Sequence, residues 1–270
     1  MIVQHNMSAA NANRMLGITT GQQSKSTEKL ASGYKINRAA DDAAGLAISE
    51  KMRYAVRGLN RASLNAQDGI SVVQIAEGAL NETHSILQRM NELATQAAND
   101  PNTSADRGKI QNEIDQLVSE IDRIRSTTQF NTMDLLDGSF KGKKLQVGML
   151  KGQTMQISIS NMDAASLSVN ALKMSDNAVA GSAMAKIQKA IDTVSAQRSK
   201  LGAIQNRLDH TIANLDNAAE NTQAAESRIR DTDMAAQMVE YSKNNILAQA
   251  GQSMLAQANQ SNQGVLSLLQ

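Results

Sequence analysis

The sequence contains no cysteine, no tryptophan, a single proline, two phenylalanines and three tyrosines among its 270 residues. Without cysteine, the chain has no disulfide, no thiolate metal site and no cysteine nucleophile. With so few aromatic residues, a core must be filled by Leu, Ile, Val, Ala and the 14 Met residues. Because proline breaks helices, its near absence leaves long helices possible along almost the whole chain. This composition favours long helices packed side by side.

Strong net charge and long apolar runs are also missing. The formal net charge is +1, which argues against a general nucleic-acid binder, because such proteins carry a basic face. No run of about 18 apolar residues occurs, so we expect no transmembrane helix and no membrane insertion. The stretch from Met1 to Asn6 shows no basic segment followed by an apolar one, so we expect no cleavable secretory signal.

Both ends of the chain are almost free of charge. From Met1 to Ser24, Arg14 is the only residue with a full charge, and the stretch 244–270 has none. A solvated surface helix normally carries many charges. An uncharged amphipathic helix, in contrast, enters a water-poor interior without the desolvation cost of a buried ion. Two interpretations remain open: flexible tails in the isolated chain, and helices that are buried in the working state.

Between the ends, apolar residues repeat with the spacing of heptad helices. A seven-residue repeat from Leu59 to Ala94 predicts a helix over 59–98, which should end before Pro101. Isoleucines and leucines spaced four and three apart predict a second helix over 104–128, and a similar seam predicts a third over 183–230. Thr103 and Asp106 resemble an N-cap box at the start of the second helix.

Residues 130–160 alternate apolar residues with polar residues or glycine in two runs, with Lys151-Gly152 between them, and this pattern predicts a β-hairpin. We therefore expect a mainly α fold: a long, antiparallel, coiled-coil-like helical bundle with a small β-hairpin region and paired N- and C-terminal helices. Two domains are predicted, one formed by residues 1–40 with 235–270 and the other by 41–234.

No arrangement of residues indicates catalysis. The three histidines, His5, His84 and His210, lie in no His-Glu-x-x-His pattern, so no metal or cofactor is expected. His84 flanks the heptad seam and is interpreted as a packing residue. The adjacent carboxylates Asp41 and Asp42 would point about 100° apart on a helix, so a role at a helix start is favoured over a shared substrate. The phosphate-loop and Gly-x-Ser-x-Gly patterns are absent, and we expect no enzyme.

Several stretches resemble the signatures of bacterial flagellins, and as a set they span nearly the whole chain. On this resemblance the chain is identified as a member of that family: a structural subunit that self-assembles into the flagellar filament for motility. Thr132 stands where the family commonly has glycine, so we expect a local turn adjustment there. The matching stretches are 29–48, 67–71, 76–80, 201–208, 225–234 and 254–259.

The resemblance implies a layout and a set of partners. The terminal helices would pair as an inner domain lining the filament core, and the heptad helices with the hairpin would surround it. Because only a short stretch separates Ile159 from the third predicted helix, the outer domains of large flagellins should be missing. The family also implies export through the flagellar secretion apparatus to the extracellular flagellum. Expected partners are further copies of the chain, an export chaperone that holds the C-terminal helix, and cap and hook-associated proteins.

Two further stretches resemble segments that host receptors read. Residues 88–94 are similar to the segment bound by the animal innate receptor Toll-like receptor 5, and Arg89, Leu93 and Glu113 match the family's contact positions. Because Arg89 and Leu93 lie off the predicted heptad seam, we expect both to be exposed. The C-terminal end resembles the leucine-rich terminus read by cytosolic inflammasome sensors. Its matching residues are Val265, Leu266, Leu268 and Leu269.

Three other functions share some of these features. A hook–filament junction protein shares the terminal helices, but the strong C-terminal signature argues against it. A secreted enzyme on a flagellin frame would need an insertion and a metal motif, and the sequence has neither. A membrane-surface or pore-forming protein is suggested by the amphipathic ends, but their lack of Lys and Arg argues against binding to anionic lipid.

Overall fold

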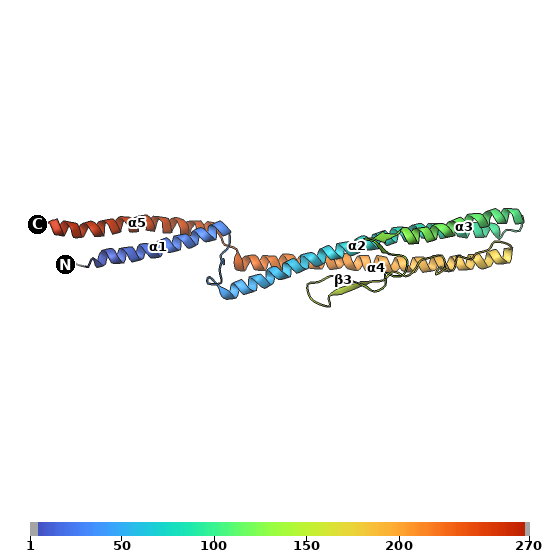
Figure 1. Cartoon of the computed structure of the whole chain (residues 1–270), viewed down its shortest axis with the longest axis horizontal. Coiled ribbons are helices and arrows are strands. Elements are labelled where there is room, and N and C mark those ends of the chain that lie inside the picture. Colours follow the sequence, from blue (N-terminus) through green and yellow to red (C-terminus); the bar gives the residue numbers. More distant parts are fainter. Residues whose placement is uncertain (1–4, 268–270) are drawn as a thin grey trace. The chain divides into compact units, whose positions relative to one another are not determined.

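The computed structural model describes the backbone of residues 5–267 and the side chains as far as residue 260. Within this range the chain is mainly helical, as predicted, with five helices and two small antiparallel strand pairs (Figure 1). No described helix is long and apolar enough to cross a membrane. The helices are α1 (Met7–Ser32), α2 (Ala43–Ala97), α3 (Ser104–Thr127), α4 (Asn177–Arg230) and α5 (Met234–Ser267).

These elements form two compact units. The terminal unit consists of Met1–Val56 and Asn221–Gln270 and contains α1 and α5. The central unit is Arg57–Glu220 and contains α3, the strands and the longer parts of α2 and α4. The predicted domain boundaries, after residue 40 and before residue 235, fall near the breaks between helices, whereas the compact units divide within α2 and α4. The assignment of the predicted domains to layers of a filament stays a prediction.

Helix α2 begins at Ala43, well before the predicted start at residue 59. A side-chain oxygen of Asp42 accepts a hydrogen bond from the Gly45 amide at 2.9 Å, which satisfies one of the free N–H groups at the helix start. The helix-start role predicted for the adjacent carboxylates therefore holds for Asp42. Asp41 instead accepts hydrogen bonds from the amides of Asn37 and Arg38, and these bonds lower the pKa of its carboxyl group.

Helix α3 matches its predicted range closely. The Thr103 hydroxyl donates to the Asp106 carboxylate at 2.7 Å and accepts from the Asp106 amide at 3.3 Å, so Thr103 caps the helix in a variant of the N-cap box, as predicted. The hydroxyl hydrogen bond is the first cause of a lowered Asp106 pKa. The start of α3 is therefore set by hydrogen bonds between Thr103 and Asp106, within the first turn of the helix.

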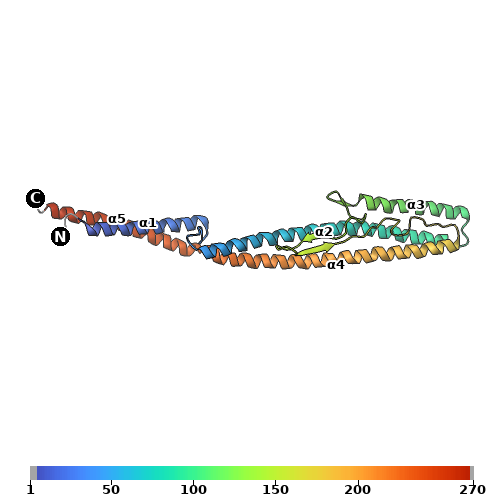
Figure 2. The ribbon, with the colours of Figure 1, turned by 60° about the horizontal axis from the view of Figure 1, so that its bottom comes forward.

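The core of the central unit lies along α2, with α3 and α4 beside it (Figures 1 and 2). The predicted seam positions Leu80 and Leu87 of α2 are fully buried, as are Ile114 of α3 and Ile187 and Leu201 of α4. The segment 158–176, between the last strand and α4, packs its apolar side chains into the same core. That stretch therefore holds no outer domain, as expected.

The β-hairpin predicted over 130–160 is confirmed, although its strands are short. Strand β3 (Lys143–Gln146) pairs antiparallel with β4 (Thr154–Ile157), and Leu145 lies opposite Met155. A second, smaller pair is formed by β1 (Gln129–Phe130) and β2 (Met133–Asp134).

The β1–β2 turn consists of Asn131 and Thr132, which have φ angles of 48° and 62°. Two-residue hairpin turns of this kind need positive φ at both positions, a conformation that glycine adopts without strain. Thr132 is β-branched and is unfavourable there. The local adjustment expected at Thr132 is therefore that this threonine adopts the left-handed backbone conformation.

The larger hairpin lies against α2 at two glycines. A Cβ added at Gly58 would come within 2.8 Å of the Met149 Cβ, and one at Gly69 would clash with the end of the Leu145 side chain. Between these glycines, the Asn65 side chain donates a hydrogen bond to the Gln146 carbonyl at 3.1 Å. Glycine at these two positions therefore sets how closely the hairpin approaches the helix.

Candidate assembly surface

Helices α1 and α5 of the terminal unit pack side by side along their length, as predicted (Figure 1). Their less exposed residues recur with alternating spacings of three and four, which is the pattern of a two-stranded coiled coil. Near one end of the pair, the Asn6 side chain donates to the Ala258 carbonyl at 3.0 Å. The seam residues are Ala9, Ala12, Leu16, Thr19, Gln23, Ser26 and Leu30 on α1, and Gln237, Tyr241, Asn244, Ala248, Gly251, Leu255 and Ala258 on α5.

This terminal seam is formed mostly by small and polar side chains. The buried residues described in α1 and α5 are all polar: Ser26, Gln237 and Asn244. Gly251 lets α1 come close, because a Cβ there would lie only 3.3 Å from Leu16 Cδ1. Ile36 is the one buried hydrophobic side chain among the described residues of the whole terminal unit.

Most large apolar side chains of the same helices are exposed, while Leu16, Leu30 and Leu255 lie on the seam. Val239 and Ile246 of α5 are 70% and 66% exposed. Because the ends also lack charges, this outward surface is apolar and uncharged over much of its length, which marks an interaction site rather than a solvated face. We name it the outward apolar surface; it consists of Met7, Met15, Ile18, Met234, Met238, Val239, Ile246, Leu247 and Met254.

A hollow in this surface lies between the two helices. It has a volume of about 290 Å³ and is lined by residues of α1, including Ala12 and Met15, and of α5, including Leu247 and Met254. The lining is largely apolar, so the hollow fits an apolar side chain better than a charged one.

At the other end of α1 and α5, hydrogen bonds join the two connections between helices in the terminal unit. The Arg230 carbonyl accepts from the Lys35 amide at 2.7 Å, and the Gly33 carbonyl accepts from the Thr232 amide at 3.0 Å. The Arg230 guanidinium stacks 4.6 Å from the centre of the Tyr34 ring and donates to Glu50 at 3.0 Å. This group of contacts, the terminal clasp, holds the α1–α2 connection against the α4–α5 connection.

Two of the three predicted receptor-binding residues meet on the surface of the central unit. The Arg89 guanidinium of α2 donates to the Glu113 carboxylate of α3 at 3.0 and 3.1 Å and to Glu92 at 3.1 Å. These hydrogen bonds, first to Glu92 and then to Glu113, raise the pKa of Arg89. The Arg89 side chain remains 52% exposed.

The expectation that Leu93 is exposed was wrong. Leu93 is only 2% exposed and belongs to the core of the central unit. A single seam of α2 predicted it on the outside, but α3 folds back along α2 and covers a second stripe of that helix. The Arg89–Glu113 ion pair joins α2 to α3 one turn before Leu93.

The predicted C-terminal receptor motif cannot be placed by its side chains. Leu268 and Leu269 lie outside the described residues, and Val265 and Leu266 are described only as backbone within α5.

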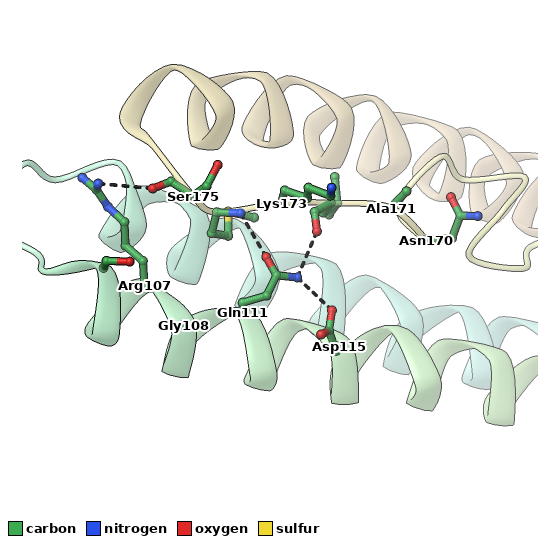
Figure 3. Close-up of a pocket in the computed structure, with 11 residues that line it drawn as sticks. Arg107, Gly108, Gln111, Asp115, Asn170, Ala171, Lys173 and Ser175 are labelled. Atoms are coloured by element: carbon green, nitrogen blue, oxygen red, sulfur yellow. Dashed lines mark hydrogen bonds between the residues drawn. The ribbon is translucent and has the colours of Figure 1, made fainter.

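A pocket of about 570 Å³ lies between α3 and the extended segment 170–175 (Figure 3). The Gln111 side-chain amide bridges the two: its Nε2 donates to the Leu172 carbonyl and its Oε1 accepts from the Met174 amide, both at 2.9 Å. Arg107 donates to the Ser175 carbonyl at 3.4 Å. These side chains act as a strand edge would and fasten the segment to the helix. Sequence periodicity does not predict this bridging role of Gln111. Its position next to the apolar residue Ile110 indicates only a polar surface residue.

The sequence also did not reveal the terminal seam. It showed that the ends lack charge, but apolar periodicity is weak in a seam whose members are mostly Ala, Gly, Ser, Thr, Asn and Gln. Within the described part of the chain, no three His, Asp or Glu side chains gather as metal ligands would. His84 is half-buried and its Nε2 lies 3.1 Å from the Gln88 amide nitrogen, which agrees with a packing residue.

Comparisons with known proteins agree on one family. The model of the bacterial flagellin N-terminal helical region matches residues 3–141, and that of the C-terminal helical region matches residues 184–269. The chain is 55% identical over 271 residues to a flagellin of Halalkalibacterium halodurans and 49% identical over 303 residues to a flagellin of Bacillus subtilis, with all of each chain covered. It is 51% identical over 286 residues to the flagellar filament 31.3 kDa core protein of Treponema maltophilum.

A solved structure is similar as well. The crystal structure of Bacillus cereus flagellin has a TM-score of 0.52 and 33% identity, and the match covers 60% of this chain and 94% of that one. Family models match most of the sequence, and full-length relatives share about half of its residues. The chain therefore belongs to the bacterial flagellins, the structural subunits of the flagellar filament.

Proposed function

We propose that this chain polymerises through the outward apolar surface of α1 and α5, which neighbouring copies cover in the filament. The single observation that carries the proposal is the inverted distribution of side chains in the terminal unit. The most buried side chains of its seam, such as Ser26, are polar, whereas Val239 and Ile246 remain exposed. A unit of this kind gains its hydrophobic stabilisation from other copies, since it has almost no apolar core of its own.

The energy available from this burial is large. Burying a fully exposed large apolar side chain contributes about 1.5–3 kcal/mol. The nine side chains of the outward apolar surface are between 46% and 73% exposed, so each contributes part of that amount when a neighbour covers it. The absence of charge matters equally, because an unpaired ion in the same position would have to be desolvated. A neighbouring copy could also place an apolar side chain in the hollow between α1 and α5.

The two units would then have separate roles. The central unit has its own apolar core, so it folds before assembly and forms the wall of the filament around the terminal helices. The terminal segments become ordered when they are buried among neighbours at the growing tip. A chain with unfolded ends would pass through a narrow export channel more easily than one with rigid ends.

Export and assembly partners are proposed from the family resemblance. We propose that the chain leaves the cell through the flagellar secretion apparatus. An export chaperone would hold the apolar side of α5 before assembly, when no other copy covers it. The cap and the hook-associated proteins would contact the terminal helices at the ends of the filament.

Recognition by Toll-like receptor 5 is proposed for the exposed ion pair of Arg89 and Glu113. These two side chains present a fixed, charged group across α2 and α3, suited to contact with a receptor. Leu93 would contribute indirectly, because its packing in the core holds α3 beside α2 and so keeps the ion pair in place. The terminal leucine motif at 265–269 stays a separate prediction for cytosolic sensors.

The proposal is tested by removing the surface in two ways. Deletion of residues 244–270 removes most of α5, and Val239→Ser with Ile246→Ser keeps the helix but places hydroxyls on the outward apolar surface. Purified variants would be examined by electron microscopy under conditions in which the wild-type chain forms filaments. We expect neither variant to form normal filaments.

The matched control is Leu150→Ser, which changes an apolar side chain of the central unit that is 54% exposed. This variant should form filaments as the wild-type chain does. Normal filaments from the deletion variant would show that α5 is not required and would exclude the proposed mechanism.

A further inference from the structure

The β3–β4 hairpin of the central unit carries only positive charge. From residue 138 to residue 162 the chain has four lysines and no acidic residue. Three of them, Lys141, Lys143 and Lys144, lie in β3 or just before it and are exposed. Lys144 points away from α2, because its neighbour Leu145 faces that helix and successive strand residues alternate in direction. We name these three lysines the basic surface.

A stretch of α4 in the same unit carries only negative charge. Between residues 208 and 220 the acidic residues are Asp209, Asp216 and Glu220, and the sequence there contains no lysine or arginine. Spacings of seven and four place these three residues on one face of the helix, and all of them are exposed. We name them the acidic surface.

The charges of the two surfaces are not paired within the chain. Among the described residues, no ion pair includes a lysine of the basic surface or a carboxylate of the acidic surface. Lys143 lies over the Phe140 ring, 6.0 Å from its centre, and Asp216 accepts a hydrogen bond from the Ser63 hydroxyl at 2.9 Å. Both surfaces are therefore available to a partner of opposite charge.

The basic and acidic surfaces lie on opposite sides of the α2–α4 pair. The hairpin lies on the side of α2 that carries Asn65, whose side chain donates to the Gln146 carbonyl. The acidic surface lies on the side that carries Ser63, which donates to Asp216. Residues two apart on a helix point about 200° away from each other. The two surfaces of one chain therefore cannot meet.

This placement determines how two copies can combine the surfaces. A two-fold pair that meets through either side places like charges together. A head-to-tail contact instead brings the basic surface of one copy against the acidic surface of the next, and it leaves one surface free at each end for a further copy. Contacts of this kind propagate without limit, as a filament requires.

We propose that the basic surface of one copy docks on the acidic surface of a second copy and sets which sides of neighbouring central units face each other. The inference rests on the proposed function for assembly itself, but it adds a contact outside the outward apolar surface. Exposed ion pairs contribute little binding individually, so the apolar surface supplies most of the stabilisation. The charges select the orientation, because other arrangements bring like charges together.

The test exchanges the charges of the two surfaces. Lys141→Glu with Lys144→Glu leaves a net negative charge on both sides of the central unit, and Asp209→Lys with Glu220→Lys leaves a net positive charge on both. The readout is the monomer concentration that remains in equilibrium with filaments, measured after sedimentation. Circular dichroism of each monomer verifies that the central unit is folded.

The matched control is Lys186→Glu with Lys189→Glu, which makes the same change in net charge at two exposed positions of α4 outside both surfaces. We expect each reversed variant to leave about tenfold more monomer than the wild-type chain, and the control to stay within about twofold. A one-to-one mixture of the two reversed variants should assemble at a lower concentration than either alone. A chain with all four surface substitutions should return to within about threefold of wild type, since its surfaces are again opposite in sign.

Wild-type monomer concentrations for both reversed variants would overturn the inference. Poor assembly that neither the mixture nor the four-substitution chain rescues would also overturn it, because the two surfaces would then not meet each other. Both results leave the outward apolar surface intact, so the proposed function would stand. Failure of the proposed function is recognised separately, by normal filaments from the chain that lacks residues 244–270.

Discussion

Residues four apart on one helix have opposite roles in this flagellin. Arg89 is 52% exposed and bonds across to Glu113, whereas Leu93, one turn later, is 2% exposed in the core. Both lie off the main seam of α2, and sequence spacing alone treats them as equivalent. The difference arises because α3 returns along α2 and covers the stripe that contains Leu93.

This assignment of Leu93 predicts a stability effect. Leu93→Ala should lower the free energy of unfolding of the central unit by about 2–5 kcal/mol, because it leaves a cavity among buried side chains. The measurement is urea unfolding followed by circular dichroism. Leu150→Ala, at a site that is 54% exposed, should change the value by less than about 0.5 kcal/mol. A Leu93→Ala effect as small as that of the control would mean that Leu93 is not a core residue.

At the scale of elements, the heptad pattern predicted the helices well where both sides of a seam are apolar. The ends of α3 agree with the prediction to within one residue, because the Thr103 cap and the isoleucine spacing indicate the same boundary. The start of α2 was missed, because it is set by the Asp42 cap and not by the heptad row that begins at Leu59. The hairpin was predicted, but its place on α2 was not, because that depends on two glycines far from it in sequence.

The role of these glycines can be measured by substitution. Gly58→Ala should lower the free energy of unfolding by about 1–3 kcal/mol, because the new Cβ would lie 2.8 Å from the Met149 Cβ and force the hairpin away. Gly78→Ala is the matched control on the same helix, where nothing lies within 4 Å of an added Cβ. The control should raise stability by about 0.5–1 kcal/mol, since alanine favours the helix. If both variants gained stability, the hairpin would not depend on a close approach at Gly58.

At the scale of the whole molecule, the two units differ in where their hydrophobic stabilisation comes from. The central unit buries its large apolar side chains within one chain, whereas the terminal unit buries only Ile36 among its described residues. The terminal clasp consists of hydrogen bonds and the stacking of Arg230 on Tyr34. It holds the α1–α2 and α4–α5 connections together but adds little apolar burial. Stability is therefore uneven along the chain.

This difference predicts a contrast in amide hydrogen exchange. In free monomers, amides of the central unit, such as those near Leu87 and Ile187, should exchange slowly, while those of α1 and α5 should exchange nearly as fast as in an unfolded chain. In filaments, both sets should be protected. Exchange followed by mass spectrometry after equal times distinguishes the two sets. Protection of α1 and α5 in monomers equal to that in filaments would contradict the proposed division of roles.

The sequence by itself determined the helical class, the positions of the central helices, the hairpin and the family, because heptad spacing, caps and motifs are local signals. It also indicated that the ends are special through their lack of charge. Only the tertiary structure decided that Leu93 is buried and that the terminal seam is polar while its outer face is apolar. The physical reason is that burial depends on which elements cover a residue, and α3 and α5 reach their partners from far along the chain.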